Sequence, residues 1–550
     1  MREVDRLTSE RYRLPSLLLM EAAAQSSLRA IHRRFPEGLG RRRALVLCGR
    51  GNNGGDGAAL ARALWLTGAQ STIILFGRVE DTRGDARINF ELAQALARFD
   101  AGTHTLPPPL SFLECENDTA WEEMSAGHHS YDIIVDALFG TGLTRPLDGV
   151  HLKVAEHLGL LRGARQRARS SEPLIVSLDI PSGINADLPE LIGEAVKADL
   201  TVTFTAPKLA NVLPPAADYN GQLEVADIGS PPSLIEAAPS KLFLSEAEDA
   251  RSWLIKTRYL PGSYKNSHGH AFIFAGSRGL AGAAALTANA AMRAGAGLVT
   301  VATSLSAQQA VAARTMPEVM TEGLAETASG ALSFEAVAGA KELMARAQSV
   351  AIGPGLTRED ESTRRFVREL VMERTAPLVV DADGLNALAP WPAEMRGSSE
   401  RPIILTPHPG EMLRLLDTTS KDALRDRVGV SSDFAVRQNV ILVLKGARTI
   451  IAAPDGRVFV NPTGNPGLGT AGAGDTLTGI VTGFLAQSSA TLLEEDDALA
   501  AVIAAVYVGG LAGDICADKL GMRTMVASDI AAHLGAAILS LDAEGERPSP

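Results

Sequence analysis

Cysteine is scarce in this chain of 550 residues. Cys48, Cys115 and Cys516 are scattered, with no CxxC pair and no neighbouring histidine at a metal-ligand spacing. An odd number of cysteines without a disulfide framework is typical of proteins kept in a reducing compartment. We therefore expect a cytoplasmic protein.

Aromatic residues and positive charge are also in short supply. Phe, Trp and Tyr make up 5% of the chain, and 64 Asp and Glu outnumber 52 Lys and Arg, for a net charge of −12. Proteins that neutralise nucleic-acid phosphates concentrate basic residues. The one basic run, residues 162–169, is more simply a solvated loop or helix face. We expect no nucleic-acid partner.

Long hydrophobic runs are missing. The apolar stretch at residues 17–20 is far too short for a signal peptide. One long uncharged run, residues 498–513, is rich in Ala, Val and Gly but falls short of the roughly 20 residues that span a bilayer. This run predicts a buried helix, and we expect no membrane partner.

The length indicates two domains, because 550 residues exceed what one ordinary hydrophobic core supports. The stretch Gly229-Ser230-Pro231-Pro232, followed by polar and acidic sequence, is typical of a domain boundary. Beyond it a strand, glycine-rich loop and helix pattern restarts near His270. We predict one domain over residues 1–235 and a second over residues 236–550.

Each half holds a glycine-rich loop that reaches an aspartate, GRGNNGGDG from Gly49 and GTAGAGD from Gly469. Glycine lets backbone N–H groups crowd around an anion, and a following helix N-terminus adds about half a positive charge. Neither loop has the Gly-Lys-Ser/Thr ending of a P-loop. Two such loops in different halves predict two binding sites.

The first half alternates strand-like and helical segments, which predicts a Rossmann-like, doubly wound parallel sheet. Polar residues follow the ends of its strands, and each alone is as readily a cap or turn residue. Together they favour a shared site whose oxygens suit a monovalent or divalent cation. The strand-like runs are residues 43–48, 71–76, 131–136, 174–179 and 199–205, and the polar residues are Asn53, Asp56, Asp136, Asp179 and Ser182.

These stretches resemble the YjeF amino-terminal domain over roughly residues 1–235. The resemblance rests on LLLMEAAA from Leu17, GNNGGDG from Gly51, DALFGTGL from Asp136, DIPSG from Asp179 and TFTAPK from Thr203. Members of that family epimerise hydrated NAD(P)H, so the resemblance implies an epimerase domain.

The resemblance also implies roles for particular residues. Asp179 would be an acid/base at the epimerised centre, and a K⁺ ion would be held by Asn53, Asp136 and Ser182. Two loops would bind substrate: Asn52, Asn53, Gly54, Gly55 and Asp56, and then Gly140, Thr141, Gly142, Leu143, Thr144, Arg145 and Pro146. Two departures stand out, MEAAA from Met20 where relatives have MENAG, and Gly77-Arg78 where some relatives place a lysine. The second proton-transfer group is left open.

The second half predicts another α/β/α domain, with the turn Gly472-Ala473-Gly474-Asp475 as its sharpest feature. In ribokinase-like enzymes a GxGD turn opens a helix, its N–H groups hold the transferred phosphoryl group, and the aspartate takes a proton from the acceptor hydroxyl. An ordinary glycine-rich helix start is the simpler alternative. For His408 the alternative is a turn residue between two prolines.

Over roughly residues 240–545 the chain resembles the ADP-dependent NAD(P)H-hydrate dehydratases, a branch of the ribokinase-like fold. The resemblance rests on DADGLN from Asp381, TPHPGE from Thr406, LKG from Leu444 and the GxGD turn. It implies substrate contacts at Ala283, Gly355, His408 and the catalytic Asp475, and a nucleotide along Lys445, Gly446, Ala447, Arg448, Thr449 and Gly474. It departs from the family at Tyr264-Lys265-Asn266 and at Ala473.

Both halves thus point to one damaged metabolite, NADH or NADPH with water added across a ring double bond. The expected protein is a bifunctional epimerase and dehydratase that uses ADP or ATP, with K⁺ in the first domain, Mg²⁺ in the second, and a homo-oligomeric state. The sequence leaves the preferred nucleotide and the preferred hydrate open. The alternative is a small-alcohol kinase fused to a non-catalytic ligand-binding domain.

Overall fold

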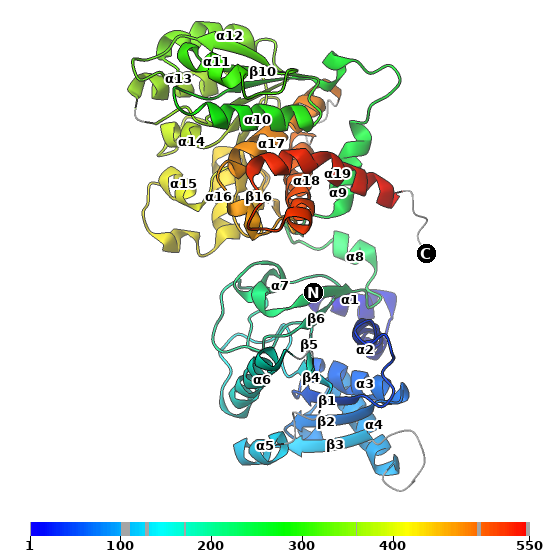
Figure 1. Ribbon diagram of the computed structural model, residues 1–550. Coiled ribbons are helices and arrows are strands. Elements are labelled where there is room, and N and C mark those ends of the chain that lie inside the picture. Colours follow the sequence, from blue (N-terminus) through cyan, green and yellow to red (C-terminus); the bar gives the residue numbers. More distant parts are fainter. Residues whose placement is uncertain are drawn as a thin grey trace. The chain divides into compact units, whose positions relative to one another are not determined.

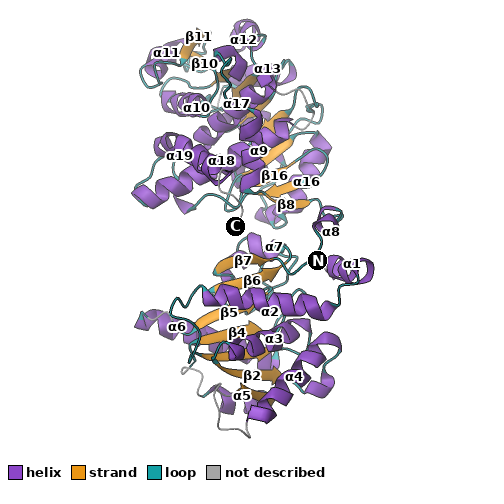
Figure 2. Ribbon diagram, turned by 90° about the vertical axis from the view of Figure 1, so that its right-hand side faces the viewer, coloured by secondary structure: helices purple, strands orange, loops and turns teal. Residues whose placement is uncertain are grey.

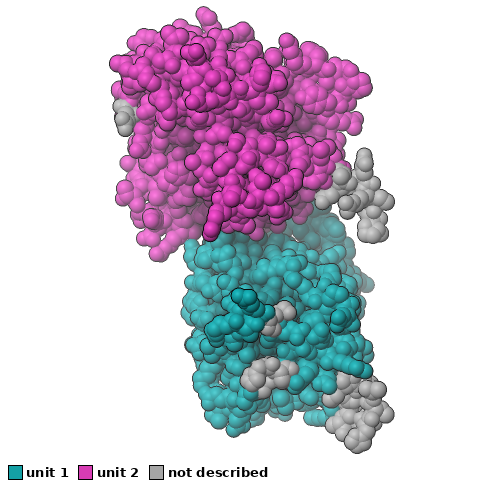
Figure 3. Space-filling view, viewed as in Figure 1, with its two compact units in different colours: residues 1–239 teal, residues 240–550 magenta. Residues whose placement is uncertain are grey.

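The computed structural model describes residues 2–100, 110–126, 131–169, 172–358, 360–491 and 497–545. It divides into two units, residues 1–239 and 240–550 (Figure 3). Each unit is an α/β/α layer structure with its own sheet and its own hydrophobic cores, so the predicted fold class is confirmed.

The sheet of the first unit has seven parallel strands in the order β3-β2-β1-β4-β5-β6-β7. Its strands are β1 Arg43–Cys48, β2 Gln70–Phe76, β3 Leu110–Cys115, β4 Ile133–Ala137, β5 Leu174–Leu178, β6 Leu200–Phe204 and β7 Gln222–Ala226. Its helices are α1 Arg2–Tyr12, α2 Ser16–His32, α3 Asn52–Leu66, α4 Gly84–Asp100, α5 Asp118–Ser125, α6 Gly149–Ala168, α7 Leu209–Val212 and α8 Pro232–Glu236.

Alternation along β1 shows how this sheet is covered on both faces. Ala44 and Val46 belong to the core shared with α2, α3 and α4, whereas Leu45 and Leu47 belong to the core shared with α5 and α6. Side chains of a strand point alternately to opposite faces, so a run of apolar residues is buried on both. Figure 1 shows α6 on one side of the strands and α3 and α4 on the other.

The second unit has ten strands in the order β11-β10-β9-β12-β13-β14-β15-β16-β17-β8, with antiparallel pairing only where β16 meets β15 and β17. The strands are β8 Leu242–Leu244, β9 His270–Phe274, β10 Leu298–Ser304, β11 Met320–Leu324, β12 Ser349–Ile352, β13 Leu378–Val380, β14 Ile403–Leu405, β15 Ile441–Leu444, β16 Ile450–Ala452 and β17 Val458–Val460. The helices are α9 Ala247–Lys256, α10 Ala281–Arg293, α11 Leu305–Ala312, α12 Val337–Met344, α13 Glu361–Met372, α14 Asp383–Leu388, α15 Pro409–Leu415, α16 Arg427–Gln438, α17 Ala473–Thr491, α18 Asp497–Leu520 and α19 Ala527–Gly545.

Small residues bring α17 very close to α10 (Figure 2). A Cβ on Gly479 would lie 2.1 Å from the carbonyl oxygen of Thr287, and one on Gly483 would lie 2.7 Å from that of Ala291. Atoms at such distances would overlap, so only glycine permits this packing. The contact fixes where α17, and therefore the glycine-rich turn before it, lies against the sheet.

The apolar run at residues 498–513 lies inside α18, which is longer than predicted and spans Asp497–Leu520. By length and composition alone this helix could cross a membrane, but 72% of its most apolar window is buried within the fold. It packs against α9, α17 and α19. The buried core helix that the sequence predicts is confirmed.

The strand β8 belongs to the second unit although it follows the boundary closely. It pairs in parallel with β17, and the rings of Phe243 and Phe459 stack with centroids 5.2 Å apart. Separating the chain between Pro239 and Ser240 is therefore expected to give two soluble fragments, since each keeps its own sheet and cores.

A fragment that begins at Glu246 instead lacks β8, exposes β17 as a sheet edge and loses the stacked rings. We expect it to unfold several degrees below the fragment that begins at Ser240, or to aggregate. Thermal unfolding of both fragments by circular dichroism tests this. Equal melting temperatures would show that β8 contributes no stability.

Candidate functional site

In the first unit the predicted site residues gather at the carboxyl ends of three neighbouring strands. Asn53 and Asp56 lie in the first turns of α3, directly after β1, and Asp136 lies near the end of β4. Asp179 follows β5 at once, in a left-handed conformation with φ of 66°. The strand order reverses between β1 and β4, and such a switch point is where open α/β sheets bind ligands.

A cavity of about 410 Å³ lies at this edge of the sheet. It joins residues of the predicted substrate loops to an apolar wall contributed mainly by α2. Residues that line it include Asp5, Ser16, Leu19, Met20, Ala23, Asn52, Asn53, Asp56, Gly140, Thr141, Gly142, Asp179, Phe204, Thr205, Lys208 and Ile228.

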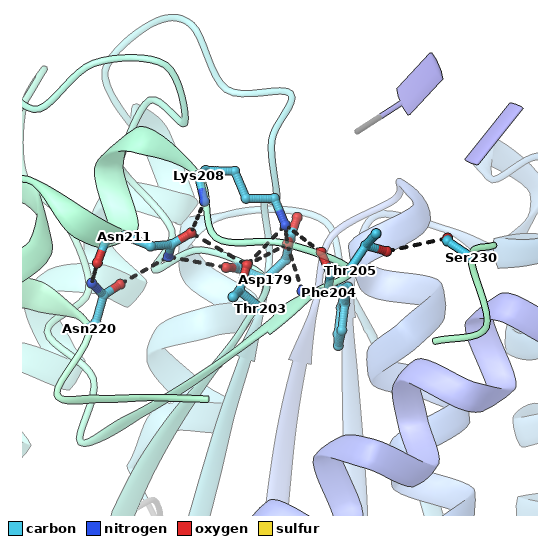
Figure 4. Close-up of polar contacts among 8 residues, drawn as sticks. All are labelled: Asp179, Thr203, Phe204, Thr205, Lys208, Asn211, Asn220 and Ser230. Atoms are coloured by element: carbon cyan, nitrogen blue, oxygen red, sulfur yellow. Dashed lines mark hydrogen bonds and ion pairs between the residues drawn. The ribbon is translucent and has the colours of Figure 1, made fainter. Parts of the chain in front are cut away.

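Asp179 is held by a buried lysine that the sequence analysis gave no role. The ammonium of Lys208 donates to the carboxylate of Asp179, to Oγ1 of Thr203 at 2.9 Å and to the carbonyl oxygen of Phe204 at 3.0 Å (Figure 4). Thr203 donates in turn to Asp179 Oδ1 at 3.2 Å. The side chains of Lys208 and Asp179 are only 7% and 14% exposed, so solvent screens this ion pair weakly.

Two further carboxyl groups face the same cavity without a comparable cation contact. Burial, followed by the negative charges of Asp179 and Asp5, raises the pKa of Asp56 well above its usual range. Burial also raises the pKa of Asp5 in α1. Like charges and low polarity both disfavour ionisation, so the cavity combines one ion-paired carboxylate with groups that hold their protons more strongly.

Two of the predicted K⁺ ligands, Asp136 and Ser182, are hydrogen-bonded to each other. Asp136 is fully buried and accepts from Ser182 Oγ at 2.5 Å, Ser182 N at 2.9 Å and Ser177 Oγ at 2.8 Å. Burial raises its pKa, although these donors oppose the shift. Asp136 therefore fixes the loop that carries Ser182.

Asn53 provides the observation that tests the fit of a cation. Its amide oxygen and nitrogen are buried and have no partner among the described residues. A Cβ on Gly140 would lie 3.4 Å from Asn53 Cγ and 3.3 Å from Asp179 Oδ2. A buried amide oxygen without a partner costs free energy. It is also a fitting ligand for a hard cation, so the residues present fit the expected ion.

The predicted loop at residues 140–146 is divided between two cavities. Gly140, Thr141 and Gly142 line the cavity that holds Asp179, whereas Leu143, Arg145 and Pro146 line a second one of about 360 Å³. The side chain of Thr144 is exposed. Arg50 also lines the second cavity and, with Arg145, places positive charge there, whereas burial lowers the pKa of His151.

Two glycines of the first predicted loop serve close packing. A Cβ on Gly54 would lie 1.8 Å from the carbonyl oxygen of Gly49, and one on Gly55 would lie 2.7 Å from Cα of Ala86. Both glycines are buried, and they are not among the residues that line the 410 Å³ cavity. They allow α3 to start close to the sheet and so position Asn53 and Asp56.

In the second unit the GxGD turn lies at the start of α17, as the sequence predicts. Gly472 has φ of 85°, and a Cβ there would lie 2.5 Å from Leu286 of α10. Burial and the carboxylate of Asp381 raise the pKa of Asp475 to about 6, against the opposite effect of Lys445. A carboxyl group with such a pKa is poised to take up a proton near neutral pH.

Lys445 joins this turn to the end of β13. Its ammonium donates to Asp381 Oδ1 at 2.7 Å, and Thr478 of α17 donates to Asp381 Oδ2 at 2.7 Å. A Cβ on Gly474 would lie 3.2 Å from Lys445 Nζ. Although burial opposes it, the negative charges of Asp381 and Glu411 raise the pKa of Lys445. The lysine is thus a fixed positive charge at the turn.

His408 reaches this cluster through Glu411. The ring accepts from Gly410 N at 3.0 Å and caps α15, while Glu411 Oε2 accepts from His408 N at 2.8 Å and lies 4.0 Å from Lys445 Nζ. Burial raises the pKa of Glu411 to about 7, although the positive charge of Lys445 opposes this shift. The His408 side chain is 52% exposed, so it is available to a ligand while acting as the turn residue.

Ala283 and Gly355 meet on the other side of the turn. A Cβ on Gly355, where φ is 66°, would lie 3.1 Å from that of Ala283. Two residues farther on, Thr357 N donates to Asp383 Oδ2 at 2.9 Å, and Asp383 is one of the charges that raise the pKa of Asp475. Asp383 thus lies between the segment that carries Gly355 and the carboxyl group of Asp475, whose pKa it affects.

The predicted nucleotide segment, residues 445–449, connects β15 to β16. Gly446 and Arg448 have φ of 147° and 58°, and the chain reverses here, since β16 pairs antiparallel with β15. The guanidinium of Arg427 donates to the carbonyl oxygen of Ala447 at 2.9 Å, and its Nε and Nη2 are buried with no partner among the described residues. Thr449 donates to the Gly446 carbonyl oxygen at 3.4 Å.

Five residues at the two sites have no role predicted from the sequence: Lys208, Asp5, Asp381, Glu411 and Arg427. Three of them stood inside the motifs already quoted, Lys208 at the end of TFTAPK, Asp381 at the start of DADGLN and Glu411 at the end of TPHPGE. The motifs were therefore a usable signal. Asp5 and Arg427 lie outside every quoted motif, and only the fold brings them to the two sites.

Comparison with known proteins covers both units. Residues 16–210 match the family described as YjeF-related protein N-terminus, and residues 271–535 match the family described as NAD(P)H-hydrate dehydratase. A bifunctional NAD(P)H-hydrate repair enzyme of Moorella thermoacetica is 40% identical over 99% of this chain and 97% of its own. This chain belongs to the bifunctional NAD(P)H-hydrate repair enzymes. The relative from Escherichia coli is 32% identical over 93% of this chain and 87% of its own.

A solved structure is similar to part of the chain. It is an ADP/ATP-dependent NAD(P)H-hydrate dehydratase of Bacillus subtilis co-crystallised with ATP and Mg²⁺, 30% identical, with a TM-score of 0.46 over 54% of this chain and 98% of its own. Membership of the repair family, established by the full-length relatives, favours metabolite repair over a small-alcohol kinase fused to a non-catalytic domain.

The buried ion pair of Lys445 and Asp381 makes a stability prediction. Lys445→Met leaves the Asp381 carboxylate buried without its cation, so the free energy of unfolding of the second unit should fall by about 3–5 kcal/mol. Lys445→Met combined with Asp381→Asn should lose less, because no unpaired charge remains. Urea unfolding monitored by tryptophan fluorescence measures both.

A matched control is Lys341→Met, which breaks the half-exposed pair of Lys341 and Glu369. Surface pairs contribute about 0–1 kcal/mol, so this variant should unfold close to the wild type. If Lys445→Met is no less stable than Lys341→Met, the buried pair does not support the fold.

Proposed function

We propose that this chain repairs hydrated NADH and NADPH in two steps. The first unit interconverts the R and S epimers of the hydrate, and the second unit dehydrates the S epimer to NAD(P)H at the expense of ADP, giving AMP and phosphate. The observation that carries the proposal is that each unit has a carboxyl group near a buried lysine at the ligand-binding edge of its sheet. The full-length similarity to repair enzymes supports it.

The second site is suited to the central difficulty of the dehydration, because hydroxide is a poor leaving group near neutral pH. In the proposed mechanism Asp475 takes the proton of the ring hydroxyl, whose oxygen attacks the terminal phosphorus of ADP, and AMP leaves. The lone pair of the ring nitrogen then expels phosphate. Loss of a proton from the neighbouring ring carbon restores the double bond.

The turn at residues 472–474 and Lys445 would stabilise the charge of the moving phosphoryl group, through backbone N–H groups and a fixed cation. The nucleotide would lie along residues 445–449, where the unpartnered donors of Arg427 supply further positive charge. Mg²⁺ would be held mainly by the nucleotide phosphates with one or two carboxylates, and it would neutralise part of their charge. Ala283, Gly355 and His408 would contact the hydrate.

In the first site Asp179 is proposed as an acid/base at the epimerised carbon, with Lys208 paired to its carboxylate and fixing its position. K⁺ would be held by oxygens of Asn53, Asp136 and Ser182, and it would supply a positive charge for the polar groups of the substrate. The unpartnered Asn53 amide supports this assignment. The substrate would be bound by residues 52–56 and 140–146.

Asp475→Asn should lower the rate of dehydration by about 10²–10⁴-fold, because the amide keeps the shape of the side chain but cannot accept a proton. Nucleotide binding should persist. The rate is followed by the absorbance of restored NADPH with the S hydrate and ADP. A rate within threefold of wild type would remove Asp475 from the mechanism.

The same assay has an expected pH dependence. The pKa of Asp475 is raised to about 6, chiefly by burial, and the base acts only when it is ionised. The kcat/KM of wild-type dehydration should therefore rise with pH through about 6 and level off above it. A flat profile across this range would contradict the assignment of the base.

Asp179→Asn should abolish epimerisation and leave dehydration of the S epimer intact, because the two groups lie in different units. With mixed epimers and ADP the expected trace is biphasic, with fast use of the S form and use of the R form only at its spontaneous epimerisation rate. Consumption of the R form at the wild-type rate would exclude Asp179 as the acid/base.

A further inference from the structure

We propose that Asp56 is the second proton-transfer group of the epimerase, acting as the acid while Asp179, which is ion-paired with Lys208, acts as the base. The proposal rests on the proposed epimerase function and assigns the group that the sequence leaves open. Two carboxyl groups of one cavity thus have opposite roles, acid and base, because their surroundings differ.

The two carboxyl groups reach the same cavity from different elements. Asp179 comes from the loop after β5 and Asp56 from the second turn of α3, and both line the 410 Å³ space. Lys208 directs its donors to Asp179, Thr203 and Phe204. No hydrogen bond or ion pair of the Asp56 carboxyl is found within the described ranges, so this group is available to a ligand.

The surroundings of Asp56 favour its acid form. Burial has the largest effect, the negative charges of Asp179 and of Asp5 in α1 add to it, and Lys208 is the cation that opposes them. Apolar side chains of Leu19 and Met20 complete this part of the wall. Where two carboxyl groups share a site but differ in surroundings, the ionised one serves as base and the protonated one as acid.

Epimerisation needs such a pair if the ring opens at the carbon that bears the hydroxyl. Asp179 takes the hydroxyl proton, the oxygen–hydrogen electron pair forms a carbonyl group, and the carbon–nitrogen bond breaks. The ring nitrogen receives that bond's electron pair and a proton from Asp56. After rotation about the adjacent single bond the nitrogen attacks the other face of the carbonyl group, and both protons return.

Ring opening is the route that this site favours, because it does not expel hydroxide. Loss of hydroxide from the same carbon is the step for which the second unit is proposed to use a nucleotide. An epimerase that expelled hydroxide unaided would form the precursor of NAD(P)H itself and leave the second site without a purpose. Ring opening only rearranges bonds, so no oxidant, reductant or phosphoryl donor is required.

The test uses the full-length protein with mixed-epimer NADPH hydrate and ADP. Asp56→Asn should slow use of the R form by at least about 10²-fold, while the S form is dehydrated at the wild-type rate, which also shows that the chain is folded. Asp56→Glu keeps an acid in the cavity and should recover a measurable part of the epimerisation. Asp81→Asn, an exposed carboxylate of the same unit, is the matched control and should behave as wild type.

Two results would overturn the proposal: R-form consumption by Asp56→Asn within threefold of wild type, or Asp56→Glu as inactive as Asp56→Asn. Epimerisation in ¹⁸O-labelled water tests the route, since ring opening predicts that the hydroxyl oxygen is retained and loss of hydroxide predicts full exchange. If the wild type itself does not interconvert the epimers, the proposed function fails, which is a different outcome from failure of Asp56 alone.

Discussion

A buried lysine paired with a carboxylate is the interaction on which each site depends. Lys208 pairs with Asp179 in the first unit, and Lys445 pairs with Asp381 in the second. Because charges in a poorly solvated site interact strongly, each lysine holds its carboxylate partner firmly in place. Burial and the negative charge of that carboxylate then raise the pKa of a second carboxyl group, Asp56 or Asp475, although the lysine opposes the shift. The two units have unrelated sheets, but each therefore combines one ion-paired carboxylate with a second carboxyl group whose pKa is raised.

The carboxylates of the two lysine ion pairs differ in what they face. In the first unit the ion-paired Asp179 itself faces the cavity, so the lysine holds the carboxylate that is proposed as the base. In the second unit Asp381 is also tied to Thr478, and its negative charge acts on Asp475 across the turn. Asp381 is thus a positioning group that anchors Lys445 and α17, whereas Asp475 is left to meet the substrate. The difference follows from α17, whose N-terminus brings a second carboxyl group to the sheet edge.

Many of the strands and site residues could be predicted from the sequence. Those that could not be predicted were missed for physical reasons. Strands buried on both faces, such as β1 and β5, are nearly continuous apolar runs and were predicted; the edge strands β3 and β7 are partly exposed and carry weaker patterns. Motif residues beside glycine-rich loops, Asp136 near the end of β4 and Asp475 in the first turn of α17 among them, were found because those loops mark them. Asp5 and Arg427 approach the sites only through packing of distant elements, which no local pattern encodes.

The stereochemistry of the hydrate gives a physical reason for both activities to belong in one chain. The phosphorylation route requires a hydroxyl in one orientation before Asp475, because the fixed turn at residues 472–474 accepts attack from one direction only. The carbon that bears this hydroxyl has two configurations, so the epimer with the other configuration would be lost to a site of this kind. Opening and closing the ring in a cavity without a phosphoryl donor converts that epimer at no cost in nucleotide. The use of a nucleotide makes dehydration in the second unit irreversible. Epimerisation in the first unit keeps supplying the epimer that the second unit uses.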